Sequence, residues 1–300
     1  MKHFFIVNPV AGPKDSSLRL KEEIEKIFEN KEDSYEIYIT TSIGDSYKIA
    51  HEKSSNLEEE TIFYACGGDG TCFDVINGIV GKPLAHFGII PIGSCNDFLK
   101  TFKTLDFKNV DKIVNGELKD IDVSKANEYY FLNEINIGFD AKVNDSCNNS
   151  KLKNKSIKKA YRNAIIKNFF SKIGDKMIIK TKSKEEEINS LLLVAANGQF
   201  YGGKYNCAPY AKVDDGLLDF VVVKKISRLR FLLLIKKYEK GLHLDNPKLK
   251  KIINYSLENK ITITAKKTLC ACLDGEIFHW DKIDIEVLPK KIKMIFPKGE

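Results

Sequence analysis

Residues 61–80 read TIFYACGGDGTCFDVINGIV, and this stretch decides the fold that we expect. An apolar strand at 61–66 runs into a glycine-rich turn at 67–71 and then into an apolar segment suited to a helix. Glycines remove the Cβ atoms that would block a polyphosphate, and the N–H groups at a helix start favour anions. The stretch therefore predicts a strand, a phosphate-binding turn and a helix.

Asp69 lies inside this turn and needs a chemical role. A carboxylate beside phosphate is repelled unless a divalent cation lies between them, or unless the carboxylate accepts a proton from an attacking hydroxyl group. Both roles fit phosphoryl transfer, and the sequence leaves both open. The alternative interpretation is a tight turn that connects a strand to a helix and has no role in binding or catalysis.

The segments around this stretch alternate between strand-like and helix-like patterns. We expect strands at 4–7, 35–40, 61–66 and 85–90, and helices at 16–28, 44–53 and 71–80. In the first of these helices, Leu20, Ile24, Ile27 and Phe28 are expected on one face, as in a helix packed on a sheet. The alternation predicts a parallel sheet with helices on its faces, which is a three-layer α/β domain.

Two further loops follow strands of this expected sheet. Residues 8–12 read NPVAG and residues 91–98 read PIGSCNDF. The carboxyl ends of parallel strands meet at one edge of a sheet, where ligands bind. We therefore expect these two loops to converge with the glycine-rich turn, although each alone is an ordinary turn signal.

The second half of the chain has a different texture, with strand-like runs broken by polar turns. Strands are expected at 129–137, 177–182, 190–196, 217–223, 261–264, 283–287 and 292–296. Two basic segments, 155–172 and 228–240, carry a helical apolar stripe. We expect a first domain at 1–125 and an antiparallel, β-rich domain at 126–300. An alternative is that the last strands return and pack on the first domain.

Composition limits the class of protein. The chain has 300 residues, 43% of them hydrophobic and 30% charged, which excludes disordered and fibrous classes. Its first residues lack a secretory apolar region, and its seven cysteines form no Cys-x-x-Cys pair, so we expect a cytoplasmic protein with reduced thiols. The formal charge of +7 is concentrated in residues 151–184 and 224–251. These basic stretches attract polyanions or simply form a solvated surface.

Several well-known catalytic patterns are absent from the sequence. It contains no Gly-x4-Gly-Lys-Ser/Thr, no Gly-x-Gly-x-x-Gly, no Gly-x-Ser-x-Gly and no His-Glu-x-x-His. The five histidines are scattered, which is typical of surface or packing residues. Nucleic-acid binding is disfavoured because the basic runs lack a recognised motif or an aromatic platform.

The ordered motifs NPVAG at 8–12, GGDGT at 67–71 and PIGSCND at 91–97 resemble the diacylglycerol kinase catalytic domain superfamily, specifically the soluble bacterial diacylglycerol kinase-like lipid kinases. The resemblance continues through FLNEINIGFDA at 131–141, NGQFYGG at 197–203, DDGLLD at 214–219 and LDGE at 273–276. It covers nearly the whole chain. It implies an α/β nucleotide-binding domain followed by a β-sandwich domain that takes the lipid.

The resemblance also implies roles for individual residues. Catalytic roles fall to Glu276, Asp274 and Asp69, and we prefer Glu276 as the group that takes the proton from the lipid hydroxyl. Asp69, Asp97 and Asp122 would form an acidic network with Mg²⁺. A structural Mg²⁺ would be held by Asp215 and by the backbone carbonyls of Lys212 and Leu217, because Mg²⁺ prefers oxygen ligands. ATP would be bound by Asn8, Pro9, Gly12, Thr40, Gly67, Gly68, Asp69, Gly70, Thr71, Gly93, Ser94 and Asn96.

The function expected from this resemblance is an ATP- and Mg²⁺-dependent lipid kinase that phosphorylates a hydroxyl of diacylglycerol or a similar lipid. Such an enzyme would work peripherally at the inner membrane surface, where the two basic segments meet anionic lipid. A homodimer is an open alternative, and no nucleic acid is expected. Asn133 and Glu134 resemble a pair in NAD kinases, so an NAD kinase-like phosphotransferase stays open. A non-catalytic, nucleotide- or lipid-responsive regulator is the third alternative.

Overall fold

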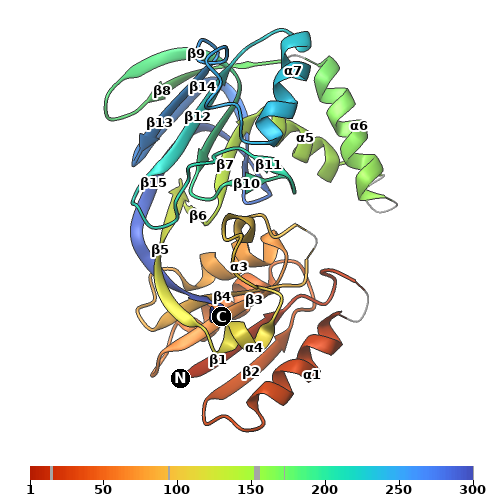
Figure 1. Cartoon of the computed structure of the whole chain (residues 1–300), viewed down its shortest axis with the longest axis vertical. Helices are drawn as coiled ribbons and strands as arrows, with labels where there is room; N and C mark the ends of the chain where they lie inside the picture. Colours follow the sequence, from red (N-terminus) through yellow and green to blue (C-terminus); the bar gives the residue numbers. More distant parts are fainter. Residues whose placement is uncertain (14–15, 94, 152–155, 172, 300) are drawn as a thin grey trace. The chain divides into compact units, whose positions relative to one another are not determined.

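The computed structural model describes residues 1–13, 16–93, 95–151, 156–171 and 173–299, and the chain divides into two structural units (Figure 1). Unit 1 comprises Met1–Val123, Tyr129–Leu132 and Leu288–Glu300. Unit 2 comprises Ser124–Glu128 and Asn133–Val287. Among the helices that the structure describes, none combines the length and the apolar character needed to cross a bilayer.

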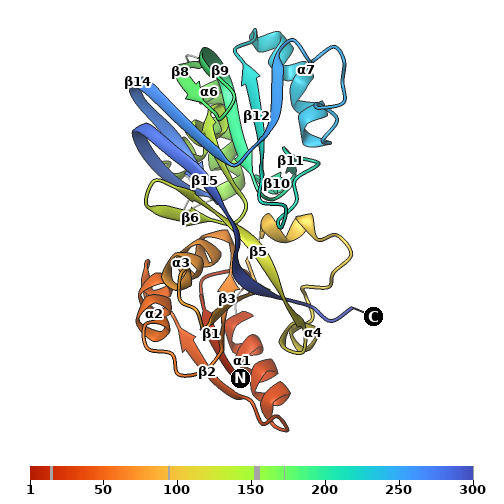
Figure 2. The same cartoon turned by 90° about the vertical axis from the view of Figure 1, so that its left-hand side faces the viewer.

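A parallel sheet forms the centre of unit 1. Its strands are β1 (Lys2–Val7), β2 (Ser34–Ile39), β3 (Thr61–Gly67) and β4 (Ala85–Pro91), in the order β4-β3-β1-β2. Figure 2 shows helices α2 and α3 on one side of this sheet and helices α1 and α4 on the other. These three layers confirm the α/β architecture predicted from the alternating pattern.

The burial of each element follows from this layering. Strands β1, β3 and β4 are buried along nearly their whole lengths because helices cover both faces of the sheet. Helix α1 buries Leu20, Ile24 and Phe28, which are spaced by one helical turn. The other elements of unit 1 are α1 (Ser16–Phe28), α2 (Asp45–Ser54), α3 (Asp69–Ile79), η1 (Phe98–Thr101), α4 (Val110–Val114) and β6 (Tyr129–Phe131), with most of β5 (Glu117–Ala126).

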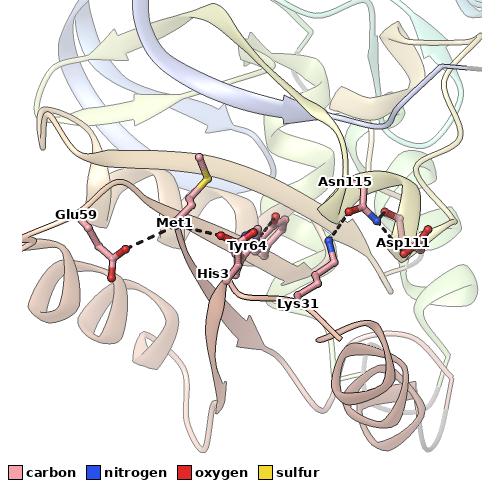
Figure 3. Close-up of polar contacts among 8 residues, drawn as sticks. Met1, His3, Lys31, Glu59, Tyr64, Asp111 and Asn115 are labelled. Atoms are coloured by element: carbon pink, nitrogen blue, oxygen red, sulfur yellow. Dashed lines mark hydrogen bonds and ion pairs between the residues drawn. The ribbon is translucent and has the colours of Figure 1, made fainter. Parts of the chain in front are cut away.

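Polar groups gather near the amino-terminal ends of the strands of unit 1 (Figure 3). His3 Nδ1 lies 3.0 Å from the hydroxyl of Tyr64, and the Met1 ammonium lies 3.0 Å from Asp33 Oδ1. The His3 side chain is buried, and burial lowers its pKa to about 4 because the imidazolium loses its hydration. His3 is therefore a neutral, packed histidine at physiological pH.

We expect unit 1 to lose stability as the pH falls below about 6.5, because the unfolded chain then binds a proton at His3 that the folded chain does not. The pKa of His3 falls from 6.5 to about 4 on folding, so roughly 3 kcal/mol of stability is lost between these two pH values. His3→Gln keeps a hydrogen-bonding side chain and removes this loss. Urea unfolding at pH 4.5 and pH 7 measures it, with His51→Gln, at an exposed histidine, as the control. An unchanged pH dependence in His3→Gln would contradict the interpretation.

Unit 2 is built from antiparallel strands, as predicted from the strand-like runs and polar turns in its sequence. The strand order is β13-β12-β9-β7-β14-β15, and β8 pairs with both β9 and β14. The strands are β7 (Glu134–Gly138), β8 (Asp175–Lys180), β9 (Glu185–Ala196), β10 (Phe200–Tyr201), β11 (Tyr205–Asn206), β12 (Leu218–Lys224), β13 (Ile253–Glu258), β14 (Lys260–Leu273) and β15 (Glu276–Phe296).

Helices α5 (Phe139–Asn148), α6 (Ile157–Phe170) and α7 (Arg228–Glu239) complete unit 2, and Figure 1 shows them on one side of its strands. Phe139 of α5 and Phe231 of α7 meet with ring centroids 4.8 Å apart. These rings belong to a buried cluster that also contains Leu192 of β9. The apolar faces of the helices and of the sheet therefore form one core.

Several parts of unit 2 differ from the expected pattern. The strand expected at 129–137 is divided into β6 (Tyr129–Phe131) of unit 1 and β7, and β13 was not predicted. Helix α5 was not predicted, because residues 139–148 are mostly polar and follow directly on a strand that ends at Gly138 with φ +108°. Residues 283–287 and 292–296 were expected as separate strands, yet both belong to β15. The strand passes Pro289, which has no N–H to donate, and continues because Lys290 adopts φ +50° and its N–H donates to Asp122 Oδ1 at 2.8 Å.

Candidate functional site

The loops that follow β1, β3 and β4 meet at the carboxyl edge of the sheet in unit 1. Gly12 has φ +76°, and a Cβ atom there would lie 1.9 Å from the carbonyl oxygen of Ile92. A Cβ atom on Gly93 would lie 2.5 Å from the Cα atom of Gly68. The carbonyl oxygen of Gly67 accepts hydrogen bonds from the N–H groups of Ile92 (3.2 Å) and Gly93 (2.9 Å). The backbones pack directly, as the expected convergence requires.

Asn8 connects the first of these loops to helix α3. Its Nδ2 donates to Thr71 Oγ1 at 3.2 Å, and its Oδ1 accepts from the N–H of Val10 at 3.2 Å. Pro9 is exposed in the same loop, and the Thr40 N–H donates to the carbonyl oxygen of Val7 at 2.9 Å. Asn8, Pro9 and Thr40 thus lie at the ends of β1 and β2, where the sequence predicted nucleotide contacts.

Asp69 is the first residue of α3, and its carboxylate is held by two consecutive backbone donors. The N–H of Asn96 donates to Oδ2 at 3.0 Å and the N–H of Asp97 donates to Oδ1 at 2.7 Å. Burial raises the pKa of Asp69 to about 6, and the negative charge of Asp97 adds to this rise. Asp69 is therefore ionised at pH 7 but gains a proton in mildly acidic solution.

The start of helix α3 has the features that a phosphate group needs. Its N-cap residue is Gly68, so no side chain caps the first N–H groups of the helix. Gly70 and Asp69 form the first turn and are both partly exposed. An anion bound here would be stabilised by the N–H groups and by the helix dipole. The residues present therefore fit the phosphates of ATP.

Asn96 supplies a second feature that fits a nucleotide. Its backbone has φ +47°, and its Nδ2 donates to the carbonyl oxygen of Gly93 at 3.0 Å. Its Oδ1 is buried and has no hydrogen-bond partner among the residues that the structure describes. A buried amide oxygen without a donor is costly, so a ligand N–H or O–H at this position would be stabilising. Ser94, predicted to lie beside it, falls outside the described residues.

The two other acidic residues that were predicted to accompany Asp69 lie in different surroundings. Asp97 is buried at the start of η1, where its Oδ1 pairs with Lys100 Nζ at 2.5 Å. Asp122 is fully buried in β5, and its Oδ1 accepts the N–H of Lys290. Asp97 joins the Asp69 loop through its own N–H, whereas Asp122 fastens the last strand of unit 1.

In unit 2, Asp274 and Glu276 occupy the turn between β14 and β15 and differ sharply in environment. Asp274 is buried, has φ +46°, and its Oδ1 accepts from the N–H groups of Asn133 (3.0 Å) and Glu134 (2.9 Å). Glu276 is exposed and pairs with Leu273 across the turn. Asp274 therefore fixes the turn, and Glu276 is the carboxylate that reaches solvent.

No local pattern in the sequence predicts that Asp274 binds the backbone of the Asn-Glu pair. Asn133 and Glu134 are both buried. Asn133 Nδ2 donates to the carbonyl oxygen of Phe200 at 2.7 Å, and Glu134 Oε1 accepts from Asn136 Nδ2 at 3.0 Å. Within unit 2 the pair thus joins β7 to the β14–β15 turn.

The predicted metal ligands lie in the loop before β12. Asp215 is exposed, and its Oδ1 accepts the N–H of Leu217 at 3.0 Å. Burial raises the pKa of the neighbouring Asp219 to about 6, although the hydroxyl of Tyr255 donates to it at 2.9 Å, and the negative charge of Asp215 contributes to the rise. Carboxylate and carbonyl oxygens from Asp215, Lys212 and Leu217 are the donor type that suits Mg²⁺.

Gly93→Ala should disrupt the carboxyl edge, because the new Cβ would overlap the backbone of Gly68. We expect a loss of about 1–3 kcal/mol in the free energy of unfolding, as for other overpacked sites. The smaller rise in melting temperature on adding ATP measures the accompanying loss of nucleotide binding. Gly299→Ala is the control, since a Cβ there meets nothing within 4 Å. ATP stabilisation equal to that of the wild type would exclude this loop from the nucleotide site.

The family profile described as diacylglycerol kinase catalytic domain matches residues 2–126. The profile described as YegS C-terminal NAD kinase beta sandwich-like domain matches residues 133–296. Each profile therefore falls on a different half of the chain, in the same order as the two kinds of fold.

Individual relatives match over nearly their full lengths. A diacylglycerol kinase of Bacillus subtilis (strain 168) is 26% identical over 301 residues, which is 98% of this chain and 95% of that protein. Two solved structures from Bacillus anthracis str. Sterne each cover 98% of this chain. One, of a diacylglycerol kinase, has a TM-score of 0.72, 26% identity and 96% of its own chain covered. The other, of a candidate diacylglycerol kinase, has a TM-score of 0.78, 29% identity and 95% covered.

Proposed function

Because the chain belongs to the diacylglycerol kinase-like lipid kinase family, we propose that it transfers the γ-phosphoryl group of ATP to a hydroxyl group of diacylglycerol or a similar lipid. The observation that carries this proposal is the carboxylate of Asp69, which two backbone N–H groups hold at the start of α3. A fixed carboxylate beside uncapped helix N–H groups suits phosphoryl transfer, since this reaction depends on positioning and electrostatic stabilisation.

The nucleotide would be bound by the loops at the carboxyl edge of unit 1. The N–H groups at the start of α3 would hold the phosphates, and Gly68 and Gly93, which have no side chains, let the two loop backbones pack together beside them. Asn96 would offer its buried Oδ1 to a donor on the nucleotide. Asn8 and Thr71, which bond each other, would support the rim of the site. This assignment gives a physical task to Asn8, Gly68, Thr71, Gly93 and Asn96 among the predicted ATP residues.

Mg²⁺ is part of the proposal, and Asp215 with the carbonyl oxygens of Lys212 and Leu217 would hold a structural ion. A second role falls to Asp69, whose carboxylate would face the metal that accompanies the nucleotide. When bound there, Mg²⁺ neutralises charge on the phosphate oxygens during transfer. Asp69 must be ionised for this role, so its raised pKa predicts that activity falls as the pH drops below about 6.

Proton removal from the lipid hydroxyl is assigned to Glu276. It is exposed, whereas Asp274 is buried and already accepts two backbone N–H groups. The hydroxyl oxygen forms a bond to the γ-phosphorus, the bond to the β–γ bridging oxygen breaks to release ADP, and the hydroxyl proton moves to the Glu276 carboxylate. Asp274 acts as a positioning residue that sets the turn carrying Glu276.

We expect Asp69→Asn and Glu276→Gln each to lower kcat for lipid phosphorylation by at least about a hundredfold, the scale of a lost general base or charge partner. Both variants keep the size of the side chain and should fold. Transfer of labelled γ-phosphate into the lipid measures the effect. Exposed carboxylates serve as controls, with Asp111→Asn in unit 1 and Asp281→Asn in unit 2. Full activity of either test variant would remove that residue from the mechanism.

The NAD kinase-like alternative depends on the Asn133–Glu134 pair. Both side chains are buried in unit 2, and Asn133 Nδ2 and Glu134 Oε1 already have partners within it. These contacts give the pair a structural task, whereas the buried Oδ1 of Asn133 has no hydrogen-bond partner among the described residues. The preference for a lipid acceptor therefore depends on the family to which the chain belongs. A non-catalytic regulator would not need an exposed Glu276 on a fixed turn, and the presence of that carboxylate favours turnover.

A lipid acceptor requires that the protein contact a membrane surface. We assign this membrane contact to helices α6 and α7. Leu229 and Leu233 of α7 are 70% and 69% exposed, and Phe170 of α6 is 73% exposed. Arg228 Nε donates to the carbonyl oxygen of Phe169 at 2.8 Å, which brings the start of α7 to the end of α6. Exposed cations on the same helices include Lys167, Arg230, Lys236 and Lys237. Apolar side chains among cations suit an anionic bilayer surface.

The double variant Leu229→Glu/Leu233→Glu should bind anionic vesicles at least about tenfold more weakly, since each inserted leucine contributes on the order of 1 kcal/mol or more. Co-sedimentation with vesicles that contain phosphatidylglycerol measures the binding. Leu18→Glu on α1 is the matched control, because Leu18 is also exposed but lies in unit 1. Equal binding by the double variant and the control would place the membrane contact elsewhere.

A further inference from the structure

A cysteine and a histidine face each other on the β14–β15 hairpin. Cys270 of β14 pairs with His279 of β15 in the antiparallel register, three pairs away from the Leu273–Glu276 pair at the turn. Directly opposite residues on antiparallel strands project from the same face of the sheet, with Cβ atoms about 4.5–5.5 Å apart. The thiol and the imidazole are therefore neighbours, although nine residues separate them in the sequence.

Helix α5 covers this face of the hairpin. Ala141 packs against Cys270 and Cys272, and Asn144 Nδ2 lies 3.4 Å from Cys272 Sγ. Asp145 follows Ala141 by one helical turn, so it projects from the same side of the helix. Its Oδ2 lies 3.9 Å from His279 Nε2. The helix thus adds a carboxylate to the cysteine and histidine.

The three donor atoms are close enough to share one ion. One donor atom each from Asp145, Cys270 and His279 lies within 4.8 Å of the other two. In a tetrahedral zinc site, the bond lengths place sulfur, nitrogen and oxygen donors roughly 3.3–3.7 Å apart, so a small inward movement of the side chains is enough. Cys270 is 7% exposed, and His279 is 53% exposed at its side chain. The cluster is therefore buried on the cysteine side and open to solvent on the histidine side.

We propose that Asp145, Cys270 and His279 form a binding site for a thiophilic divalent cation of the Zn²⁺ type. A set of one thiolate sulfur, one imidazole nitrogen and one carboxylate oxygen suits Zn²⁺ and discriminates against Mg²⁺, which takes oxygen ligands. Three protein ligands leave a fourth position for water, on the side where His279 meets solvent. The nearby cation Lys142 is paired with Asp175 at 2.6 Å, so it offers little repulsion to a metal ion.

Such an ion would join helix α5 to the β14–β15 hairpin. Near this cluster, helix α5 contacts the hairpin through the packing of Ala141 on Cys270 and Cys272 and through the weak Asn144–Cys272 contact. An ion that binds the folded chain and not the unfolded chain raises the melting temperature as its concentration rises. The site is distinct from the oxygen ligands assigned to Mg²⁺ at Asp215.

The test uses Co²⁺ as a spectroscopic probe of the full-length reduced chain, with excess Mg²⁺ present to occupy sites that have oxygen ligands only. We expect one Co²⁺ per chain, a thiolate-to-cobalt charge-transfer band, and displacement of Co²⁺ by Zn²⁺. Cys270→Ser should abolish the band. His279→Gln changes a largely exposed side chain and should fold normally. It should weaken metal binding by more than the roughly 10- to 100-fold cost of losing an outer-shell partner.

Two matched controls keep the proposal open to contradiction. Cys95→Ser removes an exposed thiol and His51→Gln removes an exposed histidine, and both variants should bind Co²⁺ like the wild type. The melting temperature should rise with Zn²⁺ in the wild type and in these controls, but not in His279→Gln. A charge-transfer band that survives in Cys270→Ser, or Co²⁺ bound without any such band, would overturn the proposal.

Discussion

The pair of hydrogen bonds from the backbone of Asn96 and Asp97 to the carboxylate of Asp69 is the constraint on which the carboxyl edge of unit 1 depends. A partly buried carboxylate needs donors to offset its lost hydration. These donors come from the loop after β4, so the carboxylate joins that loop to the start of α3. The glycines at 68 and 93 then allow the two backbones to pack without side chains between them. One interaction thus sets both the position of Asp69 and the shape of the loop around it.

A second carboxylate held by two backbone N–H groups occurs in unit 2. Asp274 also accepts two consecutive backbone N–H groups, from Asn133 and Glu134. The effect is to fix the β14–β15 turn against the start of β7, two segments about 140 residues apart in the chain. Glu276, two residues further on, has no such burial and remains accessible. In the proposed mechanism, the buried carboxylate of Asp274 would position the turn and the exposed carboxylate of Glu276 would accept the proton.

Local patterns in the sequence predicted strands β1–β4 and helices α1–α3 of unit 1, but not β5, η1 or α4. Continuous apolar runs gave β1, β3 and β4, and the spacing of Leu20, Ile24 and Phe28 gave α1, because a doubly covered parallel sheet imposes both patterns. The convergence of the three loops followed from parallel topology alone. Unit 2 was less predictable. Of β14, only residues 261–264 were expected to form a strand. The register that sets Cys270 opposite His279 could therefore not be derived.

Other features depended on tertiary packing that no local pattern encodes. The contact of Asp274 with Asn133 and Glu134 links distant segments, and its motif resembles an ordinary Asp-Gly turn. Helix α7 has apolar residues on two sides, and only the structure separates the buried Phe231, Leu234 and Tyr238 from the exposed Leu229 and Leu233. Sequence reasoning therefore located the candidate chemistry but not the contacts that hold it in place.

The central claim is that the acceptor of the phosphoryl group is a lipid. The most direct measurement offers diacylglycerol in anionic mixed micelles and NAD together in one reaction with Mg²⁺ and ATP labelled at its γ-phosphate, followed by separation of the organic and aqueous phases. We expect label in the lipid extract. Label in phosphorylated dinucleotide, with none in the lipid, would contradict it.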